Sequence, residues 1–396
     1  MIDEVSNLLN RGTSEVIVRE DLEKKLRGKR KLRIKLGIDP TGSVLHLGHA
    51  VVLNKLREFQ ELGHKVIFLI GDFTARIGDP TGRSTERPPL SDAEINANMQ
   101  HYTAQAGLLL DMKRVEVRYN SEWLGKLNFK DIIVLASKVT YAQVAQRADF
   151  KERIKNDVDL SLQEFLYPVM QGYDSVALKA DVEIGGTDQK FNLLMGRQIQ
   201  ERYDQEPQNV LTCPILEGLD GVQKMSKSLN NYIALTDNPN EMFGKIMSIP
   251  DELIKRYFEL ATNVSALEIE QISKDLEGGI NPRDLKIKLA KEIITRYYNE
   301  KKALEAKQEF IQVFSQNQAP TDIPEMKFRV VEMPIINLLI EAKLVSSKGE
   351  ARRLIEGGGV RFDGEKIIKF DQIIPFLPDG NVIQIGKRRF LKVKSV

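Results

Sequence analysis

Two histidines stand three residues apart in His46-Leu47-Gly48-His49, shortly after a Pro–Thr–Gly turn. A helix that begins there would place both imidazoles on one face of its first turn. The unpaired backbone N–H groups and the dipole of that turn favour an anion. We therefore predict that His46, Gly48 and His49 bind a nucleotide phosphate, with the glycine leaving room for a base or ribose. The alternative is a pair of surface histidines beside a packing glycine.

A second segment, Lys224-Met225-Ser226-Lys227-Ser228, follows a Leu-Asp-Gly loop. Two lysines and two hydroxyls suit a leaving group that carries several phosphate oxygens, because a flexible ammonium can follow charge that appears only in the transition state. A solvated Lys/Ser loop is the alternative. The two segments together predict substitution at phosphorus, with His46, His49, Lys224 and Lys227 as catalytic groups.

The chain of 396 residues is 42% hydrophobic and 29% charged, which predicts two or three globular domains. No run of 18 apolar residues occurs, and the N-terminus is acidic where a signal peptide is basic. The single cysteine, Cys213, excludes an internal disulfide and is expected to be a small buried residue. We expect a soluble protein with a cytoplasmic location.

Charge is distributed unevenly along the chain. Residues 333–396 contain 12 Lys/Arg and 7 Asp/Glu, a net +5, whereas the other 332 residues carry −3. Within eleven residues stand Lys343, Lys348, Arg352 and Arg353, and two of these are one helical turn apart. This pattern favours an RNA-binding surface, with a solvated basic face as the alternative.

The elements that must position these groups alternate between strand and helix over the first 215 residues. This predicts an α/β fold with a mainly parallel sheet, whose ligands lie at the carboxyl ends of the strands. The expected strands cover 32–38, 66–70, 115–117, 176–184 and 210–216, and the expected helices lie near 52–62, 92–110, 129–147 and 188–202.

Beyond residue 238 the pattern is helical, and three prolines between 316 and 334 indicate a linker. Two short helices at 335–342 and 348–356, a stop at Gly357-Gly358-Gly359 and a hairpin over 360–367 are expected after it. The predicted divisions are a catalytic domain over 1–222, a helical domain over 223–320, a linker over 321–332 and a small α+β domain over 333–396.

The two phosphate segments resemble the HIGH and KMSKS signatures of class I aminoacyl-tRNA synthetases. Within that class, residues 167–174 resemble the amino-acid-pocket helix of the tyrosyl-tRNA synthetase family, and 185–189 resemble its ribose-binding turn. The C-terminal segment is similar to the S4-type RNA-binding domain of the bacterial members. The resemblance implies a Rossmann-like catalytic domain, tyrosine, ATP and tRNA(Tyr) as substrates, an anticodon-binding helical domain, a homodimer, and Mg²⁺ delivered with ATP.

The resemblance also implies roles for single residues. Besides the two phosphate segments, the ATP contacts would be Thr41, Arg83, Arg87, Gly186 and Asp188. The tyrosine contacts would be Asp79, Tyr167, Gln171, Asp174 and Gln189. A carboxylate at 79 and neutral acceptors at 167 and 171 suit a buried ammonium. Asp174 can accept the phenol O–H, which phenylalanine lacks. We find no His/Asp/Glu cluster that demands a protein-held metal.

The sequence departs from this family at Lys35, where many members have a tyrosine that binds the substrate hydroxyl. A lysine there either pairs with Asp174 or points away from it. Lys190 stands where some members have tryptophan. The remaining alternatives are another class I enzyme, of the tryptophanyl type or a nucleotidyltransferase, and a non-catalytic RNA-binding protein of synthetase descent.

Overall fold

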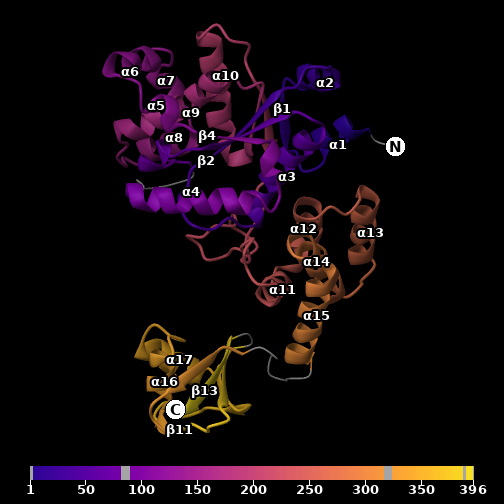
Figure 1. Cartoon of the computed structure of the whole chain (residues 1–396), viewed down its shortest axis with the longest axis vertical. Helices are drawn as coiled ribbons and strands as arrows, with labels where there is room; N and C mark the ends of the chain where they lie inside the picture. Colours follow the sequence, from indigo (N-terminus) through magenta and orange to yellow (C-terminus); the bar gives the residue numbers. More distant parts are fainter. Residues whose placement is uncertain (1–2, 82–89, 316–322, 387–388, 396) are drawn as a thin grey trace. The chain divides into compact units, whose positions relative to one another are not determined.

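The computed structural model describes residues 3–81, 90–315, 323–386 and 389–395, excluding the side chains of 313–315 (Figure 1). Its contacts define two compact units. One comprises Met1–Asn238 with Ser248–Tyr297, and the other comprises Pro239–Met247 with Tyr298–Val396. None of the described helices is both long and apolar enough to cross a membrane.

A six-stranded sheet in the order β1-β6-β5-β2-β3-β4 forms the centre of the first unit. All neighbouring strands are parallel except β1, which runs antiparallel to β6. The predicted mainly parallel α/β sheet is confirmed. The strands are β1 (Glu15–Ile17), β2 (Arg33–Ile38), β3 (Lys65–Ile70), β4 (Val115–Tyr119), β5 (Val182–Gly186) and β6 (Asn209–Cys213).

The helix that follows the first phosphate segment is α3 (Leu47–Glu61), and it packs on strands β2, β3, β5 and β6. Its apolar residues recur at helical spacing and are buried, including Leu53, Leu56 and Phe59. Burial of this stripe fixes the helix against the sheet. Its first turn therefore lies at the carboxyl end of β2.

Further helices and 3₁₀ turns complete the sheet-containing part of this unit. They are α1 (Glu4–Asn10), α2 (Arg19–Arg27), η1 (Thr74–Arg76), α4 (Asp92–Ala106), η2 (Met112–Arg114), α5 (Ser121–Leu124), α6 (Phe129–Ala136), α7 (Tyr141–Val144), α8 (Ala148–Lys155), α9 (Leu162–Leu178), η3 (Thr187–Gln189) and α10 (Lys190–Arg202). Helices α9 and α10 pack against each other, and α10 also contacts β5 and β6.

The predicted strand over 176–184 is partly wrong. Val176 and Leu178 belong to the last turn of α9, and the strand begins at Val182. Lys179 ends the helix in the left-handed conformation, with φ at 48°. Both apolar residues face the core in a helix as they would in a strand, so a short apolar run does not distinguish the two.

The remaining part of the first unit is helical, as predicted for this stretch. It contains η4 (Asp251–Leu253), α12 (Ile254–Ala261), α13 (Ala266–Glu277) and α14 (Pro282–Tyr297). Helix α12 packs on α13 and α14 and also on α3. Tyr257, fully buried in α12, donates its hydroxyl to the Glu217 carbonyl at 2.8 Å. This contact attaches the helices to the segment that precedes the lysine loop.

The second unit begins with two helices, α11 (Pro239–Met247) and α15 (Glu300–Ser315), which pack against each other. A five-stranded sheet in the order β10-β9-β12-β13-β7 follows, with a separate pair β8–β11. The helices and strands of this part of the second unit are β7 (Glu325–Phe328), β8 (Glu332–Pro334), α16 (Ile335–Glu341), α17 (Lys348–Glu356), β9 (Val360–Phe362), β10 (Glu365–Lys366), β11 (Ile373–Pro375), β12 (Asn381–Ile385) and β13 (Arg389–Ser395). The predicted helix–helix–glycine–hairpin order is confirmed, and one apolar core joins α16, α17 and the sheet.

Candidate active site

One cavity of about 830 Å³ in the first unit brings together segments that lie far apart in the sequence. It opens where β2 and β5 end, as the topology of a parallel sheet predicts. Its lining includes fourteen of the sixteen residues predicted for ATP and tyrosine: Thr41, His46, Gly48, His49, Asp79, Tyr167, Gln171, Asp174, Gly186, Asp188, Gln189, Lys224, Lys227 and Ser228. The other two, Arg83 and Arg87, lie outside the described residues.

The two histidines lie in contact at the start of α3, with their ring centroids 3.9 Å apart. The backbone N–H of His46 donates to His49 Nδ1 at 3.2 Å. Because Nδ1 of His49 accepts this bond, the neutral ring carries its proton on Nε2. The structure therefore gives His49 an Nε2–H that is available to a ligand in the cavity.

Both imidazoles are held in the neutral form. Burial lowers the pKa of His49 to about 3, with a further contribution from the cations Lys227 and Lys224. Burial, His49 and the same two lysines lower the pKa of His46 far below its usual value. The pair can thus donate hydrogen bonds to phosphate but adds no net charge to the site.

The lysine loop is bound to the histidine segment through the backbone. Leu47 N–H donates to the Ile233 carbonyl at 3.0 Å, and Leu235 N–H donates to the Leu45 carbonyl at 2.9 Å. On the other side of the loop, Met225 N–H donates to the Leu216 carbonyl at 3.0 Å. These bonds place the two predicted phosphate segments beside each other on one side of the cavity.

The buried side chain of Asn231 braces the inside of this loop. Its amide N–H groups donate to Asp220 and to the Lys224 carbonyl, and its oxygen accepts from Ser226 N–H at 2.8 Å. Sequence reasoning did not single out Asn231. The only signal for it was a polar residue close behind the lysine loop.

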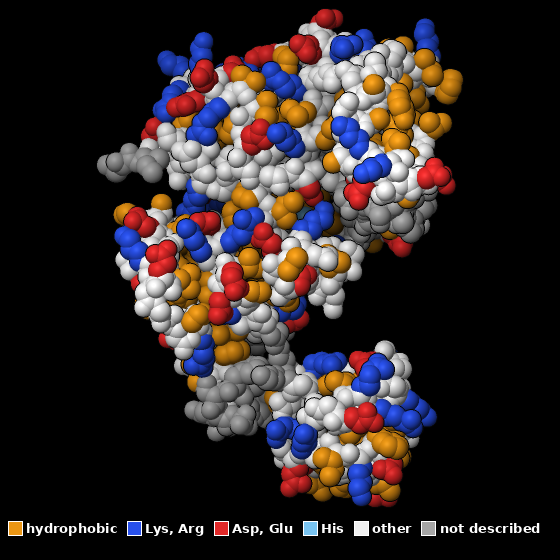
Figure 2. Space-filling model, turned by 180° about the vertical axis from the view of Figure 1, so that it is seen from behind, with side chains coloured by type: hydrophobic (Ala, Val, Ile, Leu, Met, Phe, Trp, Pro, Cys, Tyr) orange, Lys and Arg blue, Asp and Glu red, His pale blue; other side chains and the backbone are white. Residues whose placement is uncertain are grey.

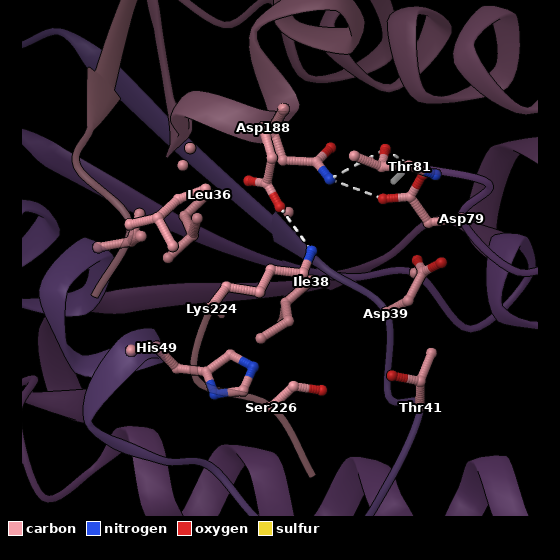
Figure 3. A pocket seen from close by; sticks show the side chains of 18 of the residues that line it. Leu36, Ile38, Asp39, Thr41, His49, Asp79, Thr81, Asp188, Lys224 and Ser226 are labelled. Carbon is pink, nitrogen blue, oxygen red and sulfur yellow. Dashed lines mark hydrogen bonds and ion pairs between the residues drawn. The ribbon is translucent and has the colours of Figure 1, made fainter. Parts of the chain in front are cut away.

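The two lysines face different partners. Lys224 Nζ lies 2.9 Å from Asp188 Oδ2, and the two side chains meet across the cavity (Figure 3). Lys227 Nζ lies 5.6 Å from the centre of the Tyr102 ring, and a Cβ added at Gly42 would collide with it. Lys227 thus reaches the loop after β2, beside the start of α3.

Asp79 lies at the centre of a polar cluster on the opposite side of the cavity from His49 (Figure 3). Its Oδ1 accepts from Thr81 N–H at 2.9 Å and from Thr81 Oγ1 at 2.6 Å, and its Oδ2 accepts from Gln189 Nε2 at 2.6 Å. Arg147, from the turn before α8, approaches Oδ1 at 3.5 Å and donates to Thr81 Oγ1 at 2.5 Å. The carboxylate is held in place by neutral donors and one cation.

A second carboxyl, Asp39, lies directly after β2. It accepts from Thr74 Oγ1 at 2.8 Å and from the Tyr167 hydroxyl at 2.9 Å. Burial raises its pKa to about 7, against the lowering effect of the Thr74 bond. The sequence motifs assigned no role to Asp39. Its position at the carboxyl end of a central strand was the signal that marked it as a site residue.

The third carboxyl, Asp174 on α9, is 2% exposed. Trp123 Nε1 donates to its Oδ1 at 2.8 Å, and Asn120 Nδ2 approaches its Oδ2 at 3.4 Å. Burial raises the pKa of Asp174 to about 7, although the Lys35 ammonium and these two donors lower it. Asn120 directly follows β4, so the strand-end rule could also have found it.

Lys35 does not pair with Asp174. Its Nζ lies 2.8 Å from Glu183 Oε1, so the pairing alternative is wrong and the ammonium points to a neighbouring strand. Lys190, the other departure, forms a surface ion pair with Glu15 at 2.6 Å.

Tyr167, Gln171 and Asp174 lie on successive turns of one face of α9, as their spacing predicted. Gln171 lines the cavity, and its buried Oε1 has no hydrogen-bond partner among the described residues. A buried acceptor without a partner is costly, so this oxygen is suited to a ligand donor.

The four basic residues predicted to bind RNA lie in the second unit and are all exposed. Lys348 begins α17 and Arg352 lies one turn later on the same face, with its guanidinium 4.7 Å from the centre of the Phe370 ring. Arg353 is the next residue on this helix, and Lys343 lies in the turn before it.

Comparisons with known proteins agree with this geometry. Residues 27–315 match the family model for class I tRNA synthetases of the tryptophan and tyrosine type. Residues 315–391 match the model for the SYY-like C-terminal domain of tyrosine–tRNA ligase. The tyrosine–tRNA ligase of Francisella tularensis is 51% identical, over 99% of this chain and 98% of its own, and that of Shewanella oneidensis is 52% identical, over 100% and 99%.

Solved structures show the same similarity. A tyrosyl-tRNA synthetase from Archaeoglobus fulgidus, complexed with L-tyrosine, has a TM-score of 0.64 at 27% identity and covers 77% of this chain and 100% of its own. The C-terminally truncated mitochondrial enzyme of Aspergillus nidulans shares the fold, with a TM-score of 0.66 at 23% identity over 79% of this chain and 95% of its own. By its sequence over nearly its full length and by its fold, the chain belongs to the tyrosine–tRNA ligase family of class I aminoacyl-tRNA synthetases.

Proposed function

We propose that this cavity joins tyrosine to ATP and then passes the tyrosyl group to tRNA(Tyr), the reaction of the family to which the chain belongs. The observation that carries the proposal is one cavity with two chemically different sides. His49 and the lysine loop supply donors for phosphate, whereas Asp79 and Asp174 supply acceptors for an amino acid.

In the first step, a tyrosine carboxylate oxygen forms a bond to the α-phosphorus of ATP while the bond from that phosphorus to the bridging oxygen breaks. Pyrophosphate leaves with the bonding electron pair, and tyrosyl-adenylate remains. Negative charge grows on phosphate oxygens, where His49 Nε2–H, Lys224 and Lys227 stabilise it. In the second step, a ribose hydroxyl oxygen of the tRNA forms an ester bond to the activated carbonyl carbon, the bond from that carbon to the phosphate oxygen breaks, and AMP leaves with the bonding electron pair while the hydroxyl proton is released.

The amino acid is positioned by the other side of the cavity. Asp79 pairs with the substrate ammonium, and the buried oxygen of Gln171 accepts one of its protons. The hydroxyl of Tyr167, which Asp39 holds in place, lies on the same face of α9. Asp174 accepts the phenol O–H, and a phenylalanine ring would leave that buried carboxyl without this partner.

For the nucleotide, Thr41, Gly48 and Gly186 lie against the base and ribose, and Asp188 exchanges its bond with Lys224 for one with the ribose. Arg83 and Arg87 are proposed as further phosphate contacts from the sequence alone. Mg²⁺ enters as part of MgATP, and the described residues contain no group of three or more His, Cys, Asp or Glu that could hold a metal.

The second unit is proposed to bind tRNA through Lys343, Lys348, Arg352 and Arg353, which form an exposed basic surface on and before α17. Lysines and arginines of this kind bind RNA mainly through its phosphates. The predicted four-part division, with the helices of 223–320 contacting the anticodon region, belongs to the same proposal. The charging of tRNA for protein synthesis is in keeping with the expected cytoplasmic location.

A homodimer is also proposed, and its support is an exposed apolar surface. Large apolar side chains of α6, α7 and the start of α9 face solvent, among them Phe129 at 78%, Tyr141 at 68% and Leu162 at 83% exposed. Hydrophobic side chains gather over this region at the upper right of Figure 2. A surface of this kind is typical of a protein interface. A parent that sediments as a dimer, with a Phe129→Asp variant that sediments as a monomer, would support it.

ATP–pyrophosphate exchange with each of the twenty amino acids, measured separately, tests the proposed reaction. We expect exchange with tyrosine alone. Exchange with tryptophan would preserve the phosphate chemistry and contradict the assignment of Asp174. Absence of exchange with any amino acid would contradict the proposed catalytic function.

A further inference from the structure

Lys35 and Glu183 form a buried ion pair between two adjacent strands. They are direct partners in the parallel ladder of β2 and β5, their charged atoms are 2.8 Å apart, and they are 0% and 1% exposed. Two charges at such a depth are costly, and an apolar pair of the same size is often as stable. The fold alone therefore does not require this pair.

The ammonium of Lys35 has three polar contacts. Besides Glu183, it donates to Ser175 Oγ at 2.9 Å and to the Gln171 carbonyl at 3.3 Å. Glu183 in turn accepts from Ser175 Oγ at 3.1 Å and from Gln208 Nε2. The pair is thus the centre of a closed network that joins β2 and β5 to α9.

This network holds the part of α9 that forms the amino-acid pocket. Gln171 and Ser175 lie on either side of Asp174 in the sequence, and Lys35 itself lines the cavity. Lys35 bonds to the Gln171 backbone, so it leaves the Gln171 side-chain oxygen available to the ligand. A shift of this helical turn would move both the ammonium acceptor and the phenol acceptor.

We propose that Lys35, held by Glu183, is a positioning residue that sets where Gln171 and Asp174 meet tyrosine and thereby contributes to selection against phenylalanine. The inference rests on the proposed function and deepens it. The substrate contacts themselves remain with α9, and the ammonium acts through them.

Charge adds to this geometric role. Asp174 faces Lys35 on β2, Glu183 on β5 and the carboxyl Asp39, with neutral donors from Trp123 and Asn120. Lys35 lowers the pKa of Asp174, whereas burial and Glu183 raise it. Loss of the ammonium would therefore keep Asp174 protonated to higher pH.

The first test is Lys35→Met, which keeps an unbranched side chain one atom shorter than lysine and removes its charge. We expect KM for tyrosine in pyrophosphate exchange to rise about 10- to 100-fold, more than kcat falls. The preference for tyrosine over phenylalanine should fall, and the acid limb of kcat/KM for tyrosine should move to higher pH. KM for ATP should stay close to that of the parent.

Lys55→Met is the matched control, because Lys55 is also buried, at 2% exposed, and pairs with Glu58 at 2.7 Å. It donates to the Leu8 and Arg11 carbonyls, and it does not line the cavity. This variant should lose stability and keep the parent KM and selectivity. Similar losses of selectivity in both variants would overturn the positioning role.

A double variant, Lys35→Met/Glu183→Gln, separates positioning from stability. Removal of the unpaired carboxylate should restore much of the melting temperature, whereas KM and selectivity should stay impaired because no ammonium holds Gln171 and Ser175. Full recovery of the melting temperature and of KM and selectivity in the double variant would overturn this inference and leave the proposed function intact. An unchanged KM for tyrosine in Lys35→Met or in the double variant, beside a parent that is active with tyrosine, would do the same. A parent without tyrosine-dependent exchange would overturn the proposed function and this inference with it.

Discussion

The two sides of the cavity are built on opposite principles. The side proposed to bind the amino acid consists of acids that the protein surrounds with donors: Asp79 accepts three hydrogen bonds, and Asp174 is enclosed by Trp123 and Asn120. The side proposed to bind phosphate consists of neutral imidazoles and two lysines, and Lys224 is about half exposed. The side chains of the first side are held by several hydrogen bonds within the protein, whereas Lys224 on the second side has one ion pair, with Asp188.

This difference matches what each side has to do. Recognition of an amino acid depends on fixed acceptors, because a buried polar group that fails to meet its partner costs free energy. Stabilisation of charge on a departing pyrophosphate favours groups that reach their best geometry only in the transition state. Substitutions on the two sides should therefore affect different steps.

The largest effect is expected on the phosphate side. Lys227→Ala should lower the rate of tyrosyl-adenylate formation by about 10²- to 10³-fold, since it removes a cation aimed at developing charge. The dissociation constant for tyrosine should hardly change. Single-turnover kinetics with equilibrium dialysis of tyrosine measures both quantities.

Lys190→Ala is the control for this prediction, since Lys190 is paired with Glu15 outside the cavity. It should leave both quantities unchanged. If the Lys227→Ala substitution weakened tyrosine binding by the same factor as it slowed tyrosyl-adenylate formation, the proposed division of roles between the two sides of the cavity would be contradicted.

Asp79→Asn should have the next largest effect, with the opposite signature. Loss of the charged acceptor for the substrate ammonium should raise KM for tyrosine about 10- to 100-fold, with a smaller change in KM for ATP. Steady-state exchange measures both constants. Asp92→Asn, at a surface acid paired with Arg76, is the control and should behave as the parent. Equal changes in the two KM values would contradict the assignment.

The third prediction concerns how the stability of the ligand-free enzyme depends on pH. The pKa of Asp174 is raised from 3.8 to about 7 in the fold, so the folded state binds more protons than the unfolded state between these values. Its contribution to stability therefore falls as pH rises from about 4 to 7 and then levels off. Histidines with a lowered pKa change in the opposite direction below pH 6.5.

The comparison of parent and Asp174→Asn isolates the carboxyl from the histidines, which both proteins share. We expect the variant to melt several degrees above the parent at pH 8 and to lose this advantage near pH 4. Thermal melts across this range test it. A pH-independent difference between the two proteins would show that the carboxyl is not held neutral by burial.

The smallest effect is expected outside the cavity. Lys348→Ala should weaken tRNA binding only a few-fold and reduce the slope of log K against log salt by about one, because it removes one phosphate contact. Exchange of pyrophosphate without tRNA should not change. Lys65→Ala, at an exposed lysine of β3 that pairs with Glu116 outside both proposed tRNA surfaces, serves as control. An unchanged salt slope in Lys348→Ala would argue against the basic surface as the RNA site.

The sequence predicted those features of the cavity that depend on the spacing of residues along the chain. The periodicity of α3, the strand ends and the face shared by Tyr167, Gln171 and Asp174 are local, so they can be recognised without the fold. The order of helices and strands in the second unit could also be predicted, because each element follows from a short stretch of sequence.

Other features depend on contacts between distant residues, which spacing does not reveal. Arg147 meets Asp79 from 68 positions away, and Tyr167 meets Asp39 from 128. The partner of Lys35 follows from the register of β2 and β5, and no local pattern shows that register. The wrong strand boundary at Val176 has another cause, since helix and strand both bury an isolated apolar pair.

The backbone bonds on either side of the lysine loop have a consequence for how such an enzyme can change over time. Leu216 holds one end and the pairing of Leu45 with Leu235 holds the other, in both cases through backbone hydrogen bonds. Main-chain anchors do not depend on side-chain identity. Natural variation can therefore alter the charge and reach of the loop in small steps while the loop stays beside the histidines, so catalytic power can be adjusted without the fold being rebuilt.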